Sequence, residues 1–239
     1  MKRKHIFAIL IIVPIVISMV SLGLNIYFLA TRPFTASSIF NMCQNSIIEI
    51  KAETESIGTS YGTGEIIAED GMIVTNAHVI TYTKLSETYL FETIFIRFVD
   101  EEDYRQVDVV KYDIEQDIAV LKLNNTGRVL KPIKIGDDSK LKVGDKVYAV
   151  GNMSNYGLSL TQGVVSIPHI NVSYNNIVRN VIQCDLTISD GNSGGALINS
   201  NGELIGLTTF RLKDKSNNIV YGISYCIPIS VVMEYVGTN

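Results

Sequence analysis

The sequence is poor in the residues that metal sites and nucleic-acid-binding surfaces require. It has only three cysteines and three histidines in 239 residues, and no CxxC pair. Zinc sites depend on closely spaced Cys and His ligands, so no metal site is expected. Four of the 20 basic residues, Lys2, Arg3, Lys4 and Arg32, flank an N-terminal apolar run, and without them the net charge of −4 becomes −8. An acidic body excludes the basic surface through which proteins bind nucleic acid.

The three cysteines leave one question open. An odd number means that at least one of Cys43, Cys184 and Cys226 stays unpaired within the chain. A disulfide between Cys184 and Cys226 and a pair of buried free thiols both fit the sequence. The composition, 46% apolar and 18% charged, is that of an ordered globular protein.

An uncharged, apolar stretch lies near the N-terminus. Residues 6–30 contain no charged residue, which is long enough for a helix to cross a bilayer. Three basic residues precede the stretch, so the positive-inside rule predicts a cytoplasmic tail over 1–5, a transmembrane signal anchor over 6–30 and an extracytoplasmic remainder. A cleaved signal peptide is the alternative, but its apolar region is shorter, and Phe28 stands where a small residue is needed. Residues 31–44 are interpreted as a linker.

The remainder, residues 45–239, is expected to be all-β. Short apolar or alternating runs, such as Met72–Thr75, Thr93–Val99 and Ile118–Leu123, are separated by turn residues. Many short strands at regular spacing indicate a β-sandwich or barrel. The length exceeds that of one small barrel, so we expect two packed barrels, over about 45–150 and 151–239, with a short C-terminal helix near Ile229–Val236.

A glycine-rich stretch, Asp190–Leu197, carries the clearest chemical signal. Ser193 stands among Gly191, Gly194 and Gly195, just before a strand-like run. Such a turn can raise a hydroxyl and turn amide N–H groups to the same side. Ser193 is therefore a candidate nucleophile, with the Gly191 and Ser193 amides as oxyanion donors. A glycine-rich hairpin with no chemical role is the alternative.

A serine nucleophile needs a base, and the sequence offers few. His5 belongs to the predicted cytoplasmic tail, which leaves His78, at the end of an apolar strand, and His169, in a predicted loop. His78 is the better candidate because a hydrophobic strand would hold it firmly. A carboxylate must then orient the imidazole. Asp117 opens a buried strand, where a charge needs a partner; Asp113 and Glu115 are alternatives in a more polar loop.

The order His78, Asp117, Ser193 is that of chymotrypsin-type triads. Three blocks, Thr75–Val79, Asp117–Lys122 and Gly191–Leu197, resemble the signatures of the HtrA/Deg trypsin-like serine proteases. Supporting blocks are Ile135–Ser139, Val143–Asp145, Ala149–Asn152, Gly163–Ser166 and Gly222–Pro228. The resemblance implies two six-stranded chymotrypsin-like β-barrels, with His78 and Asp117 in the first and Ser193 in the second.

The chain also departs from this family. Asp190 and Met153 stand where the family often has proline, and no PDZ domain is expected after the protease domain. Oligomeric state is left open by the sequence.

The resemblance also implies a specificity. A pocket lined by Ile188, Leu212 and Ile223 would take a small or medium aliphatic residue before the cleaved bond, and Thr187 lacks the acid of a Lys/Arg-specific enzyme. Thr208 and Thr209 would offer a strand edge to the substrate backbone, and Asn192 would lie beside the oxyanion hole. The predicted function is a membrane-anchored serine endopeptidase that cleaves polypeptides without a cofactor, in protein quality control or regulated proteolysis. A catalytically silent binding or chaperone module at the cell surface is the alternative.

Overall fold

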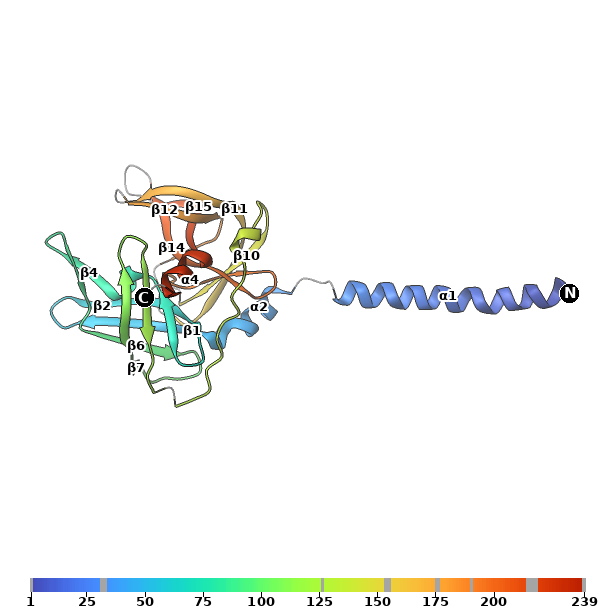
Figure 1. The fold of residues 1–239 in the computed structure, drawn as a ribbon, viewed down its shortest axis with the longest axis horizontal. Coiled ribbons are helices and arrows are strands. Elements are labelled where there is room, and N and C mark those ends of the chain that lie inside the picture. Colours follow the sequence, from blue (N-terminus) through green and yellow to red (C-terminus); the bar gives the residue numbers. More distant parts are fainter. Residues whose placement is uncertain are drawn as a thin grey trace. The chain divides into compact units, whose positions relative to one another are not determined.

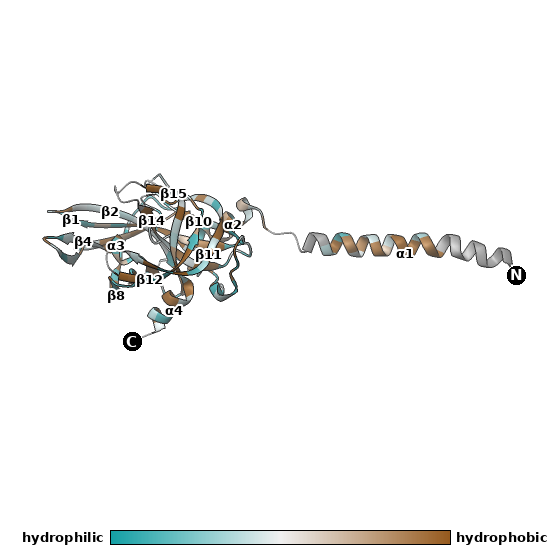
Figure 2. Ribbon diagram, turned by 90° about the horizontal axis from the view of Figure 1, so that it is seen from above, coloured by the Kyte–Doolittle hydropathy of each residue, from teal (hydrophilic) through white to brown (hydrophobic). Residues whose placement is uncertain are grey.

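The computed structural model describes residues 2–30, 34–125, 127–152, 156–174, 177–189, 191–213 and 219–237 (Figure 1). The chain divides into two compact units, Met1–Phe34 and Thr35–Asn239. The first unit contains the helix α1 (Lys2–Ala30), with Pro14 inside it. This helix covers the apolar stretch, and much of its described middle part is coloured hydrophobic in Figure 2. The large apolar side chains from Ile12 to Tyr27 are 48–69% exposed. Across the described residues, no helix combines the length and apolar character needed to cross a membrane.

The region predicted to be a linker, residues 31–44, is partly helical. Helix α2 (Ala36–Cys43) begins after Thr35, whose side chain accepts a hydrogen bond from the Ser38 backbone N–H at 3.2 Å. This is an N-cap. Ile39 and Cys43, four residues apart on one helix face, are buried in the core of the second unit. Residues 36–43 therefore belong to the folded body, because α2 buries an apolar face there.

The first half of the body is a seven-stranded antiparallel sheet among the described residues. In spatial order its strands are β7 (Arg105–Gln106), β6 (Thr93–Phe98), β1 (Ile47–Thr54), β2 (Gly58–Ile66), β3 (Met72–Thr75), β9 (Ile118–Lys122) and β8 (Asp108–Asp113). Thr75, at the end of β3, pairs with Ala119, near the start of β9. Chain segments that follow β3 and precede β9 therefore emerge at the same end of the sheet.

The second half is a closed barrel of six antiparallel strands in the described part of the chain. Around the barrel these are β10 (Lys146–Gly151), β11 (Ser159–Tyr174), β12 (Ile177–Cys184), β15 (Ile219–Pro228), β14 (Leu204–Lys213) and β13 (Ala196–Asn199). Helix α4 (Ile229–Gly237) follows β15 directly. The body is thus mostly β with a C-terminal helix, as predicted, and its second half is a six-stranded barrel; the first half is a seven-stranded sheet where a six-stranded barrel was predicted.

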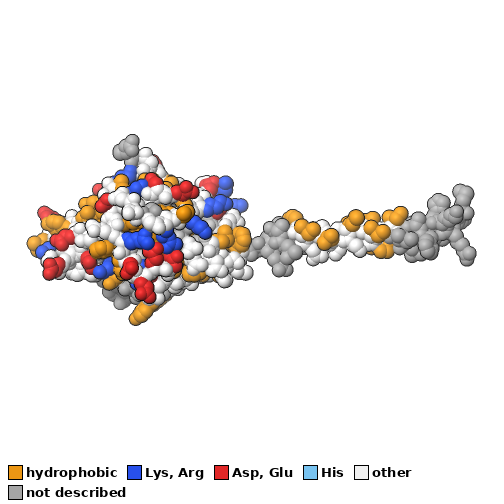
Figure 3. All heavy atoms as spheres, turned by 90° about the horizontal axis from the view of Figure 1, so that it is seen from below, with side chains coloured by type: hydrophobic (Ala, Val, Ile, Leu, Met, Phe, Trp, Pro, Cys, Tyr) orange, Lys and Arg blue, Asp and Glu red, His pale blue; other side chains and the backbone are white. Residues whose placement is uncertain are grey.

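A single hydrophobic cluster joins the two halves. It contains Ile47, Val74 and Val120 from the first sheet, Tyr148, Val150 and Leu207 from the barrel, Ile39 from α2 and Val232 from α4. All of these side chains are at most 1% exposed. On the surface face shown in Figure 3, acidic and basic side chains are interspersed, with no large area of one sign. Because the cluster contains residues from both halves, the two halves share a buried apolar interface, and this interface fixes the position of the site.

The hairpin of β4 (Thr81–Lys84) and β5 (Glu87–Leu90) was not predicted. Its turn residues, Leu85 and Ser86, have φ values of +51° and +69°. Two-residue hairpins with positive φ at both positions usually use Asn or Gly, so this sequence carries no recognisable turn signal. The hairpin follows the short helix α3 (Ala77–Ile80) and forms one wall of the cleft described below.

Candidate active site

His78 lies in α3, immediately after β3. Its neighbours Ala77, Val79 and Ile80 are buried, at most 1% exposed, whereas the His78 side chain is 47% exposed. The buried neighbours anchor the short helix and leave the imidazole in the cleft. The structure therefore places His78 three residues beyond the end of the strand from which we expected it to emerge.

Asp117 faces His78 from the start of β9. Its carboxylate oxygens both lie 2.9 Å from His78 Nδ1, and the His78 backbone N–H donates to Asp117 Oδ1 at 3.0 Å. Thr209 Oγ1 donates to the other oxygen, Oδ2, at 2.6 Å. A carboxylate can only accept, so Nδ1 carries the proton and Nε2 is left with a free lone pair. This is the tautomer that a general base needs.

The charge state of Asp117 follows from these contacts. The side chain is buried, and burial alone would raise its pKa. The electrostatic interaction with His78 and the hydrogen bonds from His78 and Thr209 outweigh burial, so the pKa of Asp117 is lowered below its ordinary value. Its backbone has φ of +60°, which Asp adopts more readily than most residues. Asn76 Nδ2 donates to the Asp117 carbonyl at 2.9 Å and supports this conformation.

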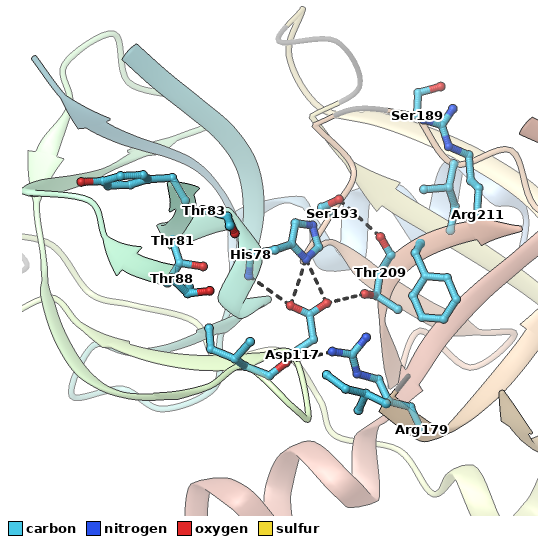
Figure 4. Close-up of a pocket in the computed structure, with 15 residues that line it drawn as sticks. His78, Thr81, Thr83, Thr88, Asp117, Arg179, Ser189, Ser193, Thr209 and Arg211 are labelled. Atoms are coloured by element: carbon cyan, nitrogen blue, oxygen red, sulfur yellow. Dashed lines mark hydrogen bonds and ion pairs between the residues drawn. The ribbon is translucent and has the colours of Figure 1, made fainter. Parts of the chain in front are cut away.

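Ser193 enters the cleft from the loop between β12 and β13. In Figure 4 the imidazole of His78 lies between Asp117 and Ser193. Ser193 Oγ donates to the Thr209 carbonyl oxygen at 3.4 Å, and within the described chain it has no hydrogen bond to the imidazole. Thr209 therefore contacts both the carboxylate and the candidate nucleophile.

The glycine after Ser193 allows the loop to pack tightly. Gly194 has φ of +75°, and a Cβ there would lie 2.1 Å from Thr75 Oγ1 and 2.4 Å from the Thr63 carbonyl oxygen. Its N–H donates to Asn76 Oδ1 at 2.7 Å. The side-chain amide of Asn76 thus holds Gly194 with its oxygen and Asp117 with its nitrogen. One side chain connects the segments that carry the nucleophile and the carboxylate.

A second connection comes from β2. The Thr63 backbone N–H donates to the Ser193 carbonyl at 3.0 Å, and Thr63 Oγ1 donates to the Gly191 carbonyl at 2.8 Å. Thr63 thus holds both carbonyl groups from the first sheet. The amide N–H groups of Gly191 and Ser193 have no hydrogen-bond acceptor among the described residues. Gly191 has φ of +91°. Asp190 and Met153, the two departures from the family pattern, lie outside the described residues.

These residues open into a cleft of about 440 Å³ between the two halves (Figure 4). It is lined by His78, Asp117 and Ser193, by Thr81–Thr83, Thr88 and Ile114 from the first half, and by Ile177, Arg179, Ile188, Ser189 and Thr209–Arg211 from the second. The structure therefore brings together the three candidate catalytic residues and a wall from each half.

The predicted substrate-binding residues are only partly in this cleft. Ile188 and Thr209 line it, whereas Leu212 and Ile223, both half-buried, are not among its walls. Thr208 is 1% exposed and its hydroxyl donates to the carbonyls of Asn192 and Gly195. Asn192, predicted beside the oxyanion hole, is 3% exposed, so its side chain lies in the interior. Local spacing could not separate the inward from the outward face of this tight loop.

Two arginines in the cleft carried no sequence signal. Arg179 lies in an otherwise ordinary alternating strand, and Arg211 follows the predicted strand edge. The other candidate base, His169, lies in β11, with its ring nitrogens 3.3 Å from Asn180 Oδ1 and from the Asp138 carbonyl oxygen. It takes no part in the cleft. All three cysteines are buried and unbridged in the part of the chain that is described.

The pair left open by the sequence, Cys184 and Cys226, consists of neighbouring thiols. A hydrogen bond with Cys184, together with burial, raises the pKa of Cys226 well above its ordinary value. The Cys226 thiol therefore stays neutral, and both cysteines pack in the barrel interior.

Comparisons with known proteins agree with this geometry. The chain is 35% identical over 175 residues to a probable periplasmic serine endoprotease DegP-like of Pseudomonas putida, which covers 73% of this chain and 34% of that protein. It is 36% identical over 176 residues to the serine endoprotease DegS of Haemophilus influenzae, covering 73% of this chain and 48% of that protein. This chain thus spans between a third and a half of the length of these two relatives.

A solved structure described as HtrA-type protease AlgW with tripeptide superimposes with a TM-score of 0.71 at 26% identity, covering 85% of this chain and 62% of that chain. Residues 62–207, which include all three candidate catalytic residues, match the trypsin-like peptidase domain. The chain belongs to the trypsin-like peptidase family, with relatives among the HtrA, DegP and DegS proteases.

Proposed function

We propose that this protein is a serine endopeptidase that cleaves polypeptides by acyl transfer to Ser193. His78 takes the Ser193 proton as Oγ attacks the substrate carbonyl, and then gives it to the leaving amine. Asp117 holds the imidazole and stabilises its charged form. The amides of Gly191 and Ser193 stabilise the oxyanion. Water then hydrolyses the acyl-enzyme, with His78 acting as base again.

One observation carries this proposal. Nδ1 of His78 lies 2.9 Å from both oxygens of a buried carboxylate, in a cleft that Ser193 also lines. A histidine with a purely structural role would need neither the buried carboxylate nor a neighbouring serine on a glycine-rich turn. Before attack, Ser193 Oγ must rotate from the Thr209 carbonyl towards Nε2, which is a change of one side-chain torsion.

The decisive experiment replaces the nucleophile. Ser193→Ala is expected to abolish cleavage of casein or a peptide and labelling by a fluorophosphonate, while the melting temperature stays close to that of the wild type. Ser200→Ala is the matched control, because Ser200 lies on a turn outside the cleft and its hydroxyl donates to the Lys146 carbonyl at 3.3 Å. Undiminished cleavage by Ser193→Ala would end the proposal.

A second candidate function is a silent protease-like module that binds polypeptides. The hydrogen bond from Ser193 Oγ to the Thr209 carbonyl favours it, since the hydroxyl is not paired with the base in this conformation. Fluorophosphonate labelling separates the two functions. A silent module would bind an unfolded polypeptide but leave Ser193 unlabelled at every pH.

We also propose that cleavage follows a small or medium aliphatic residue. Ile188, which is 4% exposed and lines the cleft, supports this specificity. A peptide library varied around the cleaved bond tests it and should include acidic residues, because Arg179 and Arg211 line the same cleft. A preference for glutamate before the cleaved bond would contradict the aliphatic assignment.

The site of action we propose is outside the cytoplasm, with the N-terminal helix as a membrane anchor. No helix among the described residues meets the requirements for a membrane span, so the anchor is proposed from the sequence, in which an uncharged stretch over 6–30 follows three basic residues. DegP-like relatives are named as periplasmic. The test is fractionation of cells that express the full chain. We expect the protein to stay in the membrane fraction after carbonate washing. We also expect protease added to intact spheroplasts to degrade it. Recovery in the soluble fraction would contradict the anchor.

A further inference from the structure

The segment that leads into Asp117 is weakly held by its own half of the molecule. Ile114, Glu115 and Gln116, between β8 and β9, are all exposed. Within this segment the Gln116 N–H donates to Asp113 Oδ1 at 2.9 Å. Exposed loops with few hydrogen bonds move more than the strands that they join. Yet Asp117, the next residue, must stay within hydrogen-bond distance of His78 Nδ1.

Arg179 supplies the missing support from the other half. It lies on β12 of the barrel, and its Nε and Nη2 donate to the carbonyl oxygens of Glu115 and Ile114 at 2.6 Å and 2.8 Å. These partners are 64 and 65 residues away in sequence. The side chain is half-buried and, like Ile114, it lines the cleft (Figure 4).

The chemistry of this contact suits arginine. The planar guanidinium presents two N–H groups at a fixed separation, so it can hold two successive carbonyls at once. Hydrogen bonds from a charged donor are stronger than neutral ones. Lysine offers a single point of charge and cannot reproduce the pair of contacts.

We propose that Arg179 is a positioning residue for the proposed peptidase reaction. By holding the Ile114 and Glu115 carbonyls it fixes the distance between the Asp117 loop and the barrel, and through Asp117 it fixes the orientation of His78. The strand that carries Arg179 ends at Cys184, nine residues before Ser193 along the chain. The two hydrogen bonds of Arg179 therefore connect the segment that leads to Ser193 with the segment that leads to Asp117. Arg179 acts through Asp117 and does not take part in proton transfer. The predicted effect on kcat rests on the proposed function, whereas the predicted effect on the orientation of His78 does not.

The perturbation is Arg179→Met, which removes the donors and keeps most of the aliphatic stem. Displacement of catalytic groups by about 1 Å can cost on the order of 100-fold in rate. We expect kcat for a short peptide to fall by about 10- to 100-fold, with KM changed less than about twofold, because substrate contacts stay in place. Arg179→Lys should recover only part of kcat.

Chemical rescue distinguishes positioning from a general loss of structure. In Arg179→Ala, guanidinium ion added below denaturing concentrations should occupy the vacated space and raise kcat. Arg128→Ala is the matched control, because Arg128 pairs with Asp100 and Glu101, which follow β6 in the first half, and does not line the cleft. That variant should keep the wild-type kcat and gain nothing from guanidinium.

A spectroscopic reading makes the inference independent of cleavage. The Nδ1 proton of His78, hydrogen-bonded to a carboxylate, should give a strongly downfield proton resonance in the wild type, and Arg179→Met should shift or broaden it. An unchanged resonance with unchanged kcat overturns the inference. So does a variant that loses activity by unfolding, without rescue, since Arg179 would then be merely structural. If the wild type itself fails to cleave while the resonance responds to Arg179→Met, the proposed function fails and the positioning role stands.

Discussion

A buried acid in the shared core should make the stability of this protein fall as pH rises. Glu65 is 0% exposed, and neither of its carboxylate oxygens has a hydrogen-bond partner among the described residues. It pairs with Ile47 on β1 and Val74 on β3, and both neighbours belong to the cluster that joins the two halves. Burial raises the pKa of Glu65 well above its ordinary value. Burial raises the pKa of the Cys43 thiol to about 12, and the charge of Glu65 makes a smaller contribution in the same direction.

The sign and size of the effect follow from proton linkage. Between the ordinary pKa and the raised one, the unfolded chain has released the Glu65 proton while the folded chain still holds it. The free energy of unfolding therefore falls by up to about 1.4 kcal/mol per pH unit across that window and levels off above it. Below the ordinary pKa this loss is absent. Even when protonated, Glu65 leaves unpaired polar atoms in the core, which cost about 1–3 kcal/mol.

Glu65→Met, with a side chain of similar length, removes both penalties. We expect it to raise the free energy of unfolding by about 1–3 kcal/mol at acidic pH and by more as pH rises. The assay is urea unfolding of the full chain at several pH values between 5 and 8, with the difference between variant and wild type as the measured quantity. Subtraction cancels the titration of other groups. Glu69→Gln, at an exposed position, is the matched control and should give a flat difference. A difference for Glu65→Met that does not grow with pH would refute the reasoning.

Three further predictions concern the cleft. Asp117→Asn should lower kcat by about 10,000-fold, because the amide favours the wrong imidazole tautomer, and steady-state kinetics with labelling of Ser193 will check this. Thr209→Val should raise the pKa of Asp117, because it removes the hydroxyl that donates to the carboxylate at 2.6 Å. As pH is lowered, this variant should therefore lose activity at a higher pH than the wild type. Thr209→Ser should keep the wild-type pH profile, and the same acid limb in both variants would contradict this role of Thr209. His169→Ala should leave kcat unchanged, since its ring contacts Asn180 and the Asp138 carbonyl outside the cleft, and a loss above about tenfold would make it a functional residue.

The sequence was sufficient to identify the three candidate catalytic residues that the structure brings together, because few were available. Of the three histidines, His78 was expected at the end of an apolar strand, and Asp117 was the carboxylate that opened a buried strand. What could not be predicted depends on contacts between distant segments. Thr209 was expected only as a strand edge, and its hydroxyl bond to Asp117 spans 92 residues. Likewise, nothing local distinguishes Arg179 from a solvated strand residue.

Failures in the fold prediction come from packing between distant segments. Residues 36–43 were interpreted as part of a linker, yet Ile39 and Cys43 bury one face of α2 in the shared core. Glu65 would be expected to face solvent, since an isolated acid is rarely buried. Only the closure of the barrel against the sheet encloses it. The position of each of these elements is decided by packing, which the pattern of one segment does not contain.

The same interface links the stability of the core to the geometry of the site. Thr63 and Glu65 are two residues apart on β2 and so lie on the same face of the sheet. Thr63 holds the Ser193 and Gly191 carbonyls. Ionisation of Glu65 in the folded state should loosen the core beneath these bonds before the whole chain unfolds, so wild-type kcat should fall reversibly at alkaline pH. Glu65→Met should keep its kcat there, as measured by cleavage of a short peptide between pH 7 and 10. An alkaline loss of the same size in both proteins would show that the nucleophile loop is held independently of the core.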